Sequence, residues 1–279
     1  MATGLDVVLA EPITFEVGDT VVHSPMVHAS VGGVRTKLIL DSGASDHVLT
    51  LDLARRAGLE SGADEPGFDH IGASVPSVML GAVSVEFSAA TLALTGVPAF
   101  EGPSAFEKWG IGGFLSPQSL HPGAWVVIDL AGNELVLVRG GTPEITGWLT
   151  SCWTNFELLM LERVPAETLV VPGAIEPFAT VPTMLNTGSS GTEFASSAVP
   201  GLRGPRSEGS GFGVSGASVD GEEAKDQVLR IGDRSFSLSV LLIRDPMPPP
   251  PGQVGMDVLA GTILAIGPDA AQPVLWLIP

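Results

Sequence analysis

The chain has 279 residues, 44% of them apolar, which allows one large fold or two domains of about 140 residues each, with a sizeable core. A net charge of −18, from 13 Lys and Arg against 31 Asp and Glu, argues against nucleic acid and anionic membrane surfaces as partners. Cys152 is the single cysteine, which excludes an intrachain disulfide and a multi-cysteine metal site.

Glycine and proline set the expected fold class. The chain contains 35 Gly and 23 Pro with few long amphipathic helical patterns, which favours many short strands joined by tight turns. We therefore predict a mostly β protein. A secretory signal pattern and an apolar run of membrane-spanning length are both missing from the sequence. We expect a cytoplasmic protein, or a secreted one if a leader has been trimmed.

The first strands lead to a conspicuous acidic residue. Alternating apolar and polar residues predict strands at 6–16, 20–29 and 34–40. The third of these is apolar and ends in Asp41-Ser42-Gly43-Ala44, so a buried strand delivers a carboxylate to a turn. Thr50 then caps a predicted short helix that ends at Gly58.

A hairpin and a glycine-rich strand follow. Between residues 68 and 87, β-like runs surround Gly72, Ala73 and Ser74, small residues that suit a mobile hairpin tip; an ordinary surface turn is the alternative. In the strand predicted at 109–115, glycine lets two backbones touch, and Trp109 lines a pocket or belongs to the core. A short helix at 116–120 and a hairpin at 124–138 complete this half.

The pattern then restarts. Residues 141–155 bear Gly and Thr, and their shift in composition predicts a connector between a domain at 1–140 and a second at 156–279. In the second half we expect strands at 156–162, 168–171 and 178–185, with a turn at Pro172-Gly173. The last of these strands runs into a second copy of the motif, which reads Asn186-Thr187-Gly188-Ser189.

Further elements return in the same order. The sequence Gly216-Ala217-Ser218 repeats the first Gly-Ala-Ser, residues 255–259 repeat the glycine–helix element, and residues 262–278 repeat the final hairpin. Repetition of several elements in one order indicates a duplicated fold.

An apolar strand followed by Asp or Asn, a hydroxyl residue and glycine, present twice about half a chain apart, resembles the aspartic peptidases of the pepsin-like and retropepsin-like types. The resemblance implies an all-β bilobal fold, with two β-barrel lobes related by a pseudo-twofold axis and a few short helices. Ala44 follows one branch and Ser189 the other, which suits a bilobal bacterial member.

The resemblance also assigns roles to residues. It implies a catalytic pair at Asp41 and position 186, with Ser42 and Thr187 bonding across to the opposite loop. Gly43 and Gly188 let the backbone turn, and Ser189 stands where the family has a serine that bonds the outer carboxylate oxygen.

The expected substrate follows from the same family. An extended polypeptide, or an apolar ligand, would lie in the cleft under the two Gly-Ala-Ser hairpins and beside Trp109. No cofactor or metal is implied. Both halves of the site are in one chain, so we expect a monomer.

Asn186 departs from the family pattern, because an amide cannot ionise or pass on a proton. Loss of a general acid or base typically removes ~10²- to 10⁴-fold in rate, so we expect a poor peptidase. Two interpretations stay open. Either asparagine was introduced into an active enzyme, or it is native and the fold serves as a binding cleft or uses Asp41 alone for acid–base chemistry.

Overall fold

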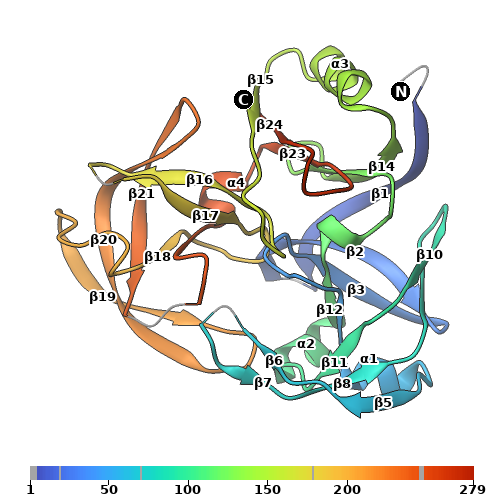
Figure 1. Cartoon of the computed structure of the whole chain (residues 1–279). Coiled ribbons are helices and arrows are strands. Elements are labelled where there is room, and N and C mark those ends of the chain that lie inside the picture. The colour runs from blue at the N-terminus through green and yellow to red at the C-terminus, as the bar shows by residue number, and fades with distance from the viewer. Residues whose placement is uncertain (1–4, 19, 70, 178, 245–247) are drawn as a thin grey trace.

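The computed structural model describes residues 5–18, 20–69, 71–177, 179–244 and 248–279 (Figure 1). The fold is mostly β, as the glycine and proline content predicts. Within the described residues, the strands form one fifteen-stranded sheet, one seven-stranded sheet and a separate two-stranded hairpin. No helix in the described part of the chain is long and apolar enough to cross a membrane.

We call residues 5–140 the first half. Its elements are β1 (Asp6–Val17), β2 (Thr20–Val31), β3 (Val34–Leu40), β4 (Val48–Thr50), α1 (Leu51–Arg56), β5 (Ser61–Asp64), β6 (Gly67–Phe68), β7 (Ser74–Val75), β8 (Ser77–Leu80), β9 (Val83–Glu86), β10 (Thr91–Leu94), β11 (Pro98–Phe100), α2 (Ser104–Trp109), β12 (Ile111–Leu115), η1 (Pro117–Ser119), β13 (Trp125–Asp129) and β14 (Glu134–Arg139).

The remaining elements begin with the helix α3 (Thr142–Cys152) and continue through what we call the second half, residues 156–279. They are β15 (Glu157–Leu161), β16 (Val170–Ile175), β17 (Val181–Leu185), β18 (Glu193–Ala195), β19 (Arg206–Phe212), β20 (Ser218–Ile231), β21 (Arg234–Ile243), β22 (Gly252–Val254), α4 (Met256–Leu259), β23 (Ile263–Ile266) and β24 (Val274–Ile278).

The two halves pair their strands in the same pattern. In the first half β12 lies parallel to β3 and antiparallel to β4, and β4 lies parallel to β11. In the second half β22 lies parallel to β17 and antiparallel to β18, and β18 lies parallel to β21. The repeat seen in the sequence is therefore also a repeat of strand pairing.

Glycine permits the close crossing of backbones near each motif, at Gly113 within β12 and at Gly255 just after β22. A Cβ on Gly113 would lie 2.1 Å from the carbonyl oxygen of Val48. A Cβ on Gly255 would lie 2.5 Å from the carbonyl oxygen of Gly191. Both contacts are far shorter than a carbon atom tolerates, which confirms the expectation that glycine lets two backbones touch beside each motif.

The final hairpins of the two halves join in one sheet. Strands β13 and β14 form the hairpin of the first half, β23 and β24 form that of the second, and β13 pairs antiparallel with β23. Strands β1 and β15 extend this sheet on either side, near the labelled chain ends (Figure 1). The sequence predicts each hairpin but not the pairing between them.

The structure corrects two of the sequence predictions. The connector at 141–155 contains an eleven-residue helix, α3, because Ile145 and Leu149 find an apolar partner surface around Trp125. Pro172 and Gly173 do not form a turn. They continue β16, where Pro172 lies opposite Pro182 of β17. Proline is tolerated at this pair because neither Pro172 nor Pro182 has to donate a backbone N–H to the other strand.

Candidate active site

Asp41 and Asn186 occupy equivalent places at the ends of β3 and β17. The backbone N–H of Asp41 donates to the carbonyl oxygen of Leu115 at 3.0 Å, and that of Asn186 donates to Val254 at 2.9 Å. Each acceptor is the last residue of the parallel neighbour, β12 or β22. The strand pairing therefore fixes both motif residues by the same backbone contact.

Two buried hydroxyl residues tie the motifs together. The Ser42 N–H donates to the Thr187 hydroxyl at 3.0 Å, and the Thr187 N–H donates to the Ser42 hydroxyl at 3.0 Å. Each hydroxyl in turn donates to the opposite strand, from Ser42 to Leu185 at 2.5 Å and from Thr187 to Leu40 at 2.6 Å. Ser42 and Thr187 thus bond across to the opposite loop.

The two glycines let each motif approach the side chain of the other. A Cβ on Gly43 would lie 2.5 Å from the side-chain Cγ of Asn186, and one on Gly188 would lie 2.5 Å from Cγ of Asp41. The side chains of Asp41 and Asn186 are therefore each in contact with the backbone of the opposite motif. Gly43 and Gly188 are needed here for space.

The side chains of Asp41 and Asn186 accept matching hydrogen bonds. Gly43 N–H donates to Oδ1 of Asp41 and Gly188 N–H donates to Oδ1 of Asn186, both at 2.8 Å. Asp41 is half-buried, whereas Asn186 is 7% exposed. Asp41 presents a carboxylate that can accept protons, and Asn186 presents an amide that cannot.

Asn186 belongs to a buried polar chain that sequence analysis missed. Its Nδ2 donates to Oε1 of Gln253 at 2.9 Å, and Nε2 of Gln253 donates to Oε2 of Glu193 at 2.8 Å. Aligning the two halves strand by strand would have revealed both residues, because their counterparts in the first half are apolar.

Other residues hold the motif loops from outside. Nε2 of Gln118 donates to the carbonyl oxygen of Ser42 at 2.8 Å. The Ser24 hydroxyl donates to the carbonyl oxygen of Gly188 at 3.1 Å. The Ser189 hydroxyl donates to the carbonyl oxygen of Gly191 at 2.9 Å. This contact differs from the bond to a carboxylate oxygen that the family resemblance implies, because the hydroxyl closes a local turn.

Both Gly-Ala-Ser sequences lie at hairpin tips, and the tips touch. Gly72 and Ala73 lie in the turn between β6 and β7, and Gly216 and Ala217 lie in the turn between β19 and β20 (Figure 1). Ser74 and Ser218 begin the strands that follow. The buried Asp69 carboxylate accepts N–H bonds from its own turn and a hydroxyl bond of 2.5 Å from Ser215 of the other.

An apolar cluster lies beside Asp41 and contacts both hairpins. Ile39 of β3 and Phe114 of β12 belong to it, together with the half-buried Trp109. Val75 of β7 and Val214 of the second hairpin turn pack against the same cluster. Trp109 thus lies among residues next to the motif and also contributes to packing.

Part of the chain matches a known protein family. Residues 27–110 match the family model for aspartyl proteases. The matched segment begins in β2, contains the Asp41 motif and the β6–β7 hairpin, and ends just after α2. No curated protein matches the chain. Asn186 lies outside the matched segment, so its place opposite Asp41 rests on the structure and on the internal repeat.

His47 and Asp257 are titratable but structural. His47 accepts the Ser116 N–H at Nδ1 (3.1 Å), and Nε2 lies 3.1 Å from the carbonyl oxygen of Ser119, so it joins the loop after Asp41 to η1. Burial lowers the pKa of His47. Burial raises the pKa of Asp257, although the Thr192 N–H and hydroxyl bond its carboxylate. Neither side chain bonds to Asp41 or Asn186 in these contacts.

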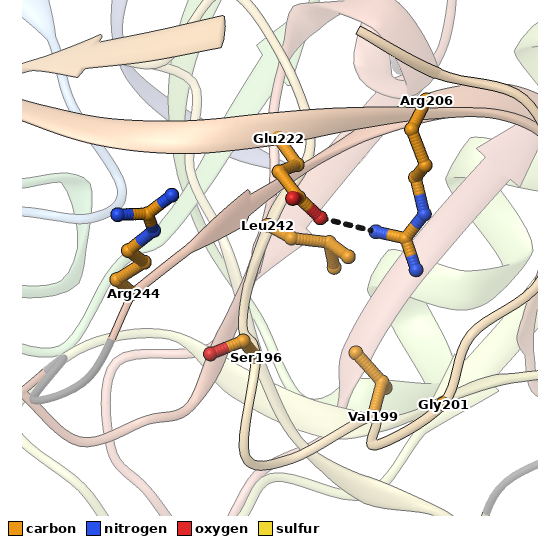
Figure 2. A pocket seen from close by; sticks show the side chains of 7 residues that line it. All are labelled: Ser196, Val199, Gly201, Arg206, Glu222, Leu242 and Arg244. Carbon is orange, nitrogen blue, oxygen red and sulfur yellow. Dashed lines mark hydrogen bonds and ion pairs between the residues drawn. The ribbon is translucent and has the colours of Figure 1, made fainter. Parts of the chain in front are cut away.

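A separate surface pocket of about 250 Å³ lies in the second half. Figure 2 shows Arg206 and Glu222 pointing toward one another in an ion pair of 3.3 Å, with Leu242 beside the pair and Arg244 on the opposite side of Glu222 from Arg206. None of its lining residues belongs to the network around Asp41 and Asn186. The described residues also contain no cluster of His, Cys, Asp and Glu that could hold a metal ion.

Proposed function

We propose that the protein is an aspartic-peptidase-type protein that binds an extended polypeptide beside Asp41 and Asn186 and hydrolyses it poorly. The observation that carries this proposal is the reciprocal bonding of Ser42 and Thr187, which joins the two motifs. The aspartyl protease match of residues 27–110 supports a protease-type function for the first motif. We further propose that residues 1–140 and 156–279 act as two lobes of one monomer.

The chemistry explains the expected low activity. Hydrolysis by this route needs a water held between two carboxyl groups that share one proton. Asp41 can act as the base toward that water. Asn186 can hold the water or the substrate carbonyl by a hydrogen bond, but it has no proton to give.

The surroundings suit a peptide in extended form. The two hairpin tips provide backbone groups of the kind that pair with an extended chain. The cluster of Ile39, Phe114 and Trp109 provides apolar contact for a side chain of the ligand. An acidic protein of this composition is not expected to bind nucleic acid.

Restoring the missing carboxyl group tests the proposal. We expect Asn186→Asp to cleave denatured protein at acidic pH, ~10²- to 10⁴-fold faster than the parent chain, and a statine-type inhibitor to block it. The double variant Asp41→Asn/Asn186→Asp keeps one carboxyl group in the site, as the parent chain does, and should be no more active than the parent. An Asn186→Asp protein that is folded but inert would contradict the proposal.

A second candidate is a non-proteolytic protein that uses the cleft for binding or uses Asp41 alone for acid–base chemistry. The two hydrogen bonds of the Asn186 amide favour it, because its NH₂ group donates to Gln253 and its oxygen accepts from Gly188. Turnover of a non-peptide substrate by the parent chain, abolished in Asp41→Ala, would support this candidate. Peptidase activity in Asn186→Asp without such turnover would exclude it.

A further inference from the structure

We propose that Gln253 and Glu193 form a hydrogen-bond chain that holds residue 186 as a donor, so that a carboxyl group placed there keeps its proton while Asp41 carries the charge. The catalytic meaning of this assignment rests on the proposed function. The chain itself rests only on the contacts of three buried residues. Gln253 and Glu193 are positioning residues in this proposal.

The hydrogen-bond chain of Asn186, Gln253 and Glu193 is buried. Asn186 is 7% exposed, Gln253 is 0% exposed and Glu193 is 9% exposed. The hydrogen bonds of 2.9 Å and 2.8 Å that connect them run through the side chains of neighbouring strands, because Gln253 of β22 lies opposite Glu193 of β18 in the antiparallel ladder. A buried polar chain is stable when every member is satisfied.

The direction of the chain follows from its carboxylate end. A carboxylate oxygen accepts hydrogen bonds and does not donate them, and Oε2 of Glu193 accepts from the NH₂ group of Gln253. The carbonyl oxygen of Gln253, which also only accepts, then faces residue 186. Residue 186 must therefore donate. An amide donates, and so does a protonated carboxyl, whereas a carboxylate would place two acceptors face to face.

The first half has no such chain. Phe114 occupies the place of Gln253, since it pairs with β3 and β4 as Gln253 pairs with β17 and β18. Val48 occupies the place of Glu193 in the same alignment. The side chains of Phe114 and Val48 cannot accept a hydrogen bond, so the two halves surround their matching motif residues differently.

This hydrogen-bond chain also limits which groups fit at position 186. A site adapted to an ionised aspartate would turn a donor toward residue 186, whereas Gln253 presents an acceptor. Asparagine fits the chain as it stands. An amide and a protonated carboxyl group both meet this requirement, whereas an ionised carboxylate does not.

Among the described residues, other titratable groups lie near this region. Asp41 lies on the far side of Gly188, and Asp257 of α4 is bonded to Thr192, the neighbour of Glu193. Glu223 of β20 pairs with Leu241 of β21, which is itself opposite Glu193. Removing the Asp41 charge isolates the titration of a carboxyl group at position 186, because two interacting carboxyl groups would otherwise titrate as a coupled pair.

The test compares Asp41→Asn/Asn186→Asp with the same protein carrying Glu193→Gln in addition. A glutamine at 193 can donate to Gln253, which can then turn its own NH₂ toward the carboxyl group at position 186. We expect that carboxyl group to bind its proton at least about tenfold more tightly in the double variant than in the triple variant, because only the double variant keeps an acceptor opposite it. The readout is the chemical shift of its carboxyl carbon as a function of pH, measured by NMR.

Stability provides an independent readout. A raised pKa for the carboxyl group at position 186 means that the stabilising contribution of this group is complete below the unfolded carboxyl pKa of about 3.9 and is lost as pH rises through the folded value. The triple variant should lose less over this interval in denaturant titrations. Equal proton affinities in the two variants would overturn the proposal. If the triple variant fails to fold, a pKa at or below about 3.9 for this group in the double variant would overturn it.

These measurements separate the inference from the proposed function, since neither depends on turnover. A tightly held proton at position 186 in the double variant, together with an inert Asn186→Asp protein, would contradict the peptidase proposal and support the proposed hydrogen-bond chain. An active Asn186→Asp protein, together with an ordinary carboxyl titration at position 186, would contradict the proposed role of the hydrogen-bond chain and support the peptidase proposal.

Discussion

Ser42 and Thr187 are 145 residues apart, and each donates its buried backbone N–H to the hydroxyl of the other at 3.0 Å. The hydroxyls continue to the carbonyl oxygens of Leu185 and Leu40. This crossed arrangement holds the turn after β3 against the turn after β17. The positions of Asp41 and Asn186 depend on it, because each side chain contacts the glycine that follows the opposite hydroxyl residue.

Thr187→Val tests this bonding with little change of shape. The variant leaves the Ser42 N–H and the Leu40 carbonyl oxygen buried without their partner, which should lower the free energy of unfolding by about 1–3 kcal/mol. Denaturant titration measures the loss. Thr183→Val is the matched control, because its buried hydroxyl donates only to Val181 within β17. Equal losses in the two variants would contradict a special role for Thr187.

Gly188→Ala tests the space between the motifs. The added Cβ would lie 2.5 Å from Cγ of Asp41 and must displace that carboxylate. In the Asn186→Asp background we expect peptidase activity to fall by about 10²-fold, the cost of misplacing a catalytic group by roughly 1 Å. Gly191→Ala is the control, since its Cβ would meet nothing within 4 Å. Undiminished activity in Gly188→Ala would count against the close approach.

Asp69→Asn tests the contact between the hairpin tips. An asparagine at 69 can still accept bonds within its own turn, but it replaces the oxygen that accepts from Ser215 with an amide donor. We expect hydrogen exchange at the backbone amides of both tips to become at least about tenfold faster, with global stability little changed. The control Asp64→Asn, at an exposed position on β5, should leave hydrogen exchange at the two hairpin tips unaltered. Unchanged exchange in Asp69→Asn would show that the tips are held by other contacts.

His47→Gln tests a pH dependence. Because burial lowers the pKa of His47 in the folded state, its stabilising contribution is complete above the unfolded pKa of about 6.5 and declines as pH falls toward the folded value. Glutamine can bond to Ser116 and Ser119 without titrating. We therefore expect the variant to lose less stability than the parent as pH drops below about 6.5, measured by denaturant titration. Parallel curves for the two proteins would refute this.

Local sequence predicts much of this fold. The strand that delivers Asp41 follows from an apolar run before a glycine turn, and the helix α1 begins at Thr50 as expected, with the Thr50 hydroxyl accepting the Leu53 N–H. Such features depend on neighbouring residues along the chain. The helix α3 escapes prediction because its stability depends on packing around Trp125, and the extended conformation of Pro172 depends on Pro182 across the ladder.

The two motifs and their similarity are recognisable from the sequence alone, because each consists of an acid or amide, a hydroxyl residue and a glycine within a few positions. Contacts between distant strands decided the rest. Gln253 and Glu193 carry no local signal, and they acquire a role only because β22 and β18 bring them in line with Asn186. A hydrogen-bond chain has a direction only when all of its members are in place, so the requirement for a donor at residue 186 could emerge only from folding.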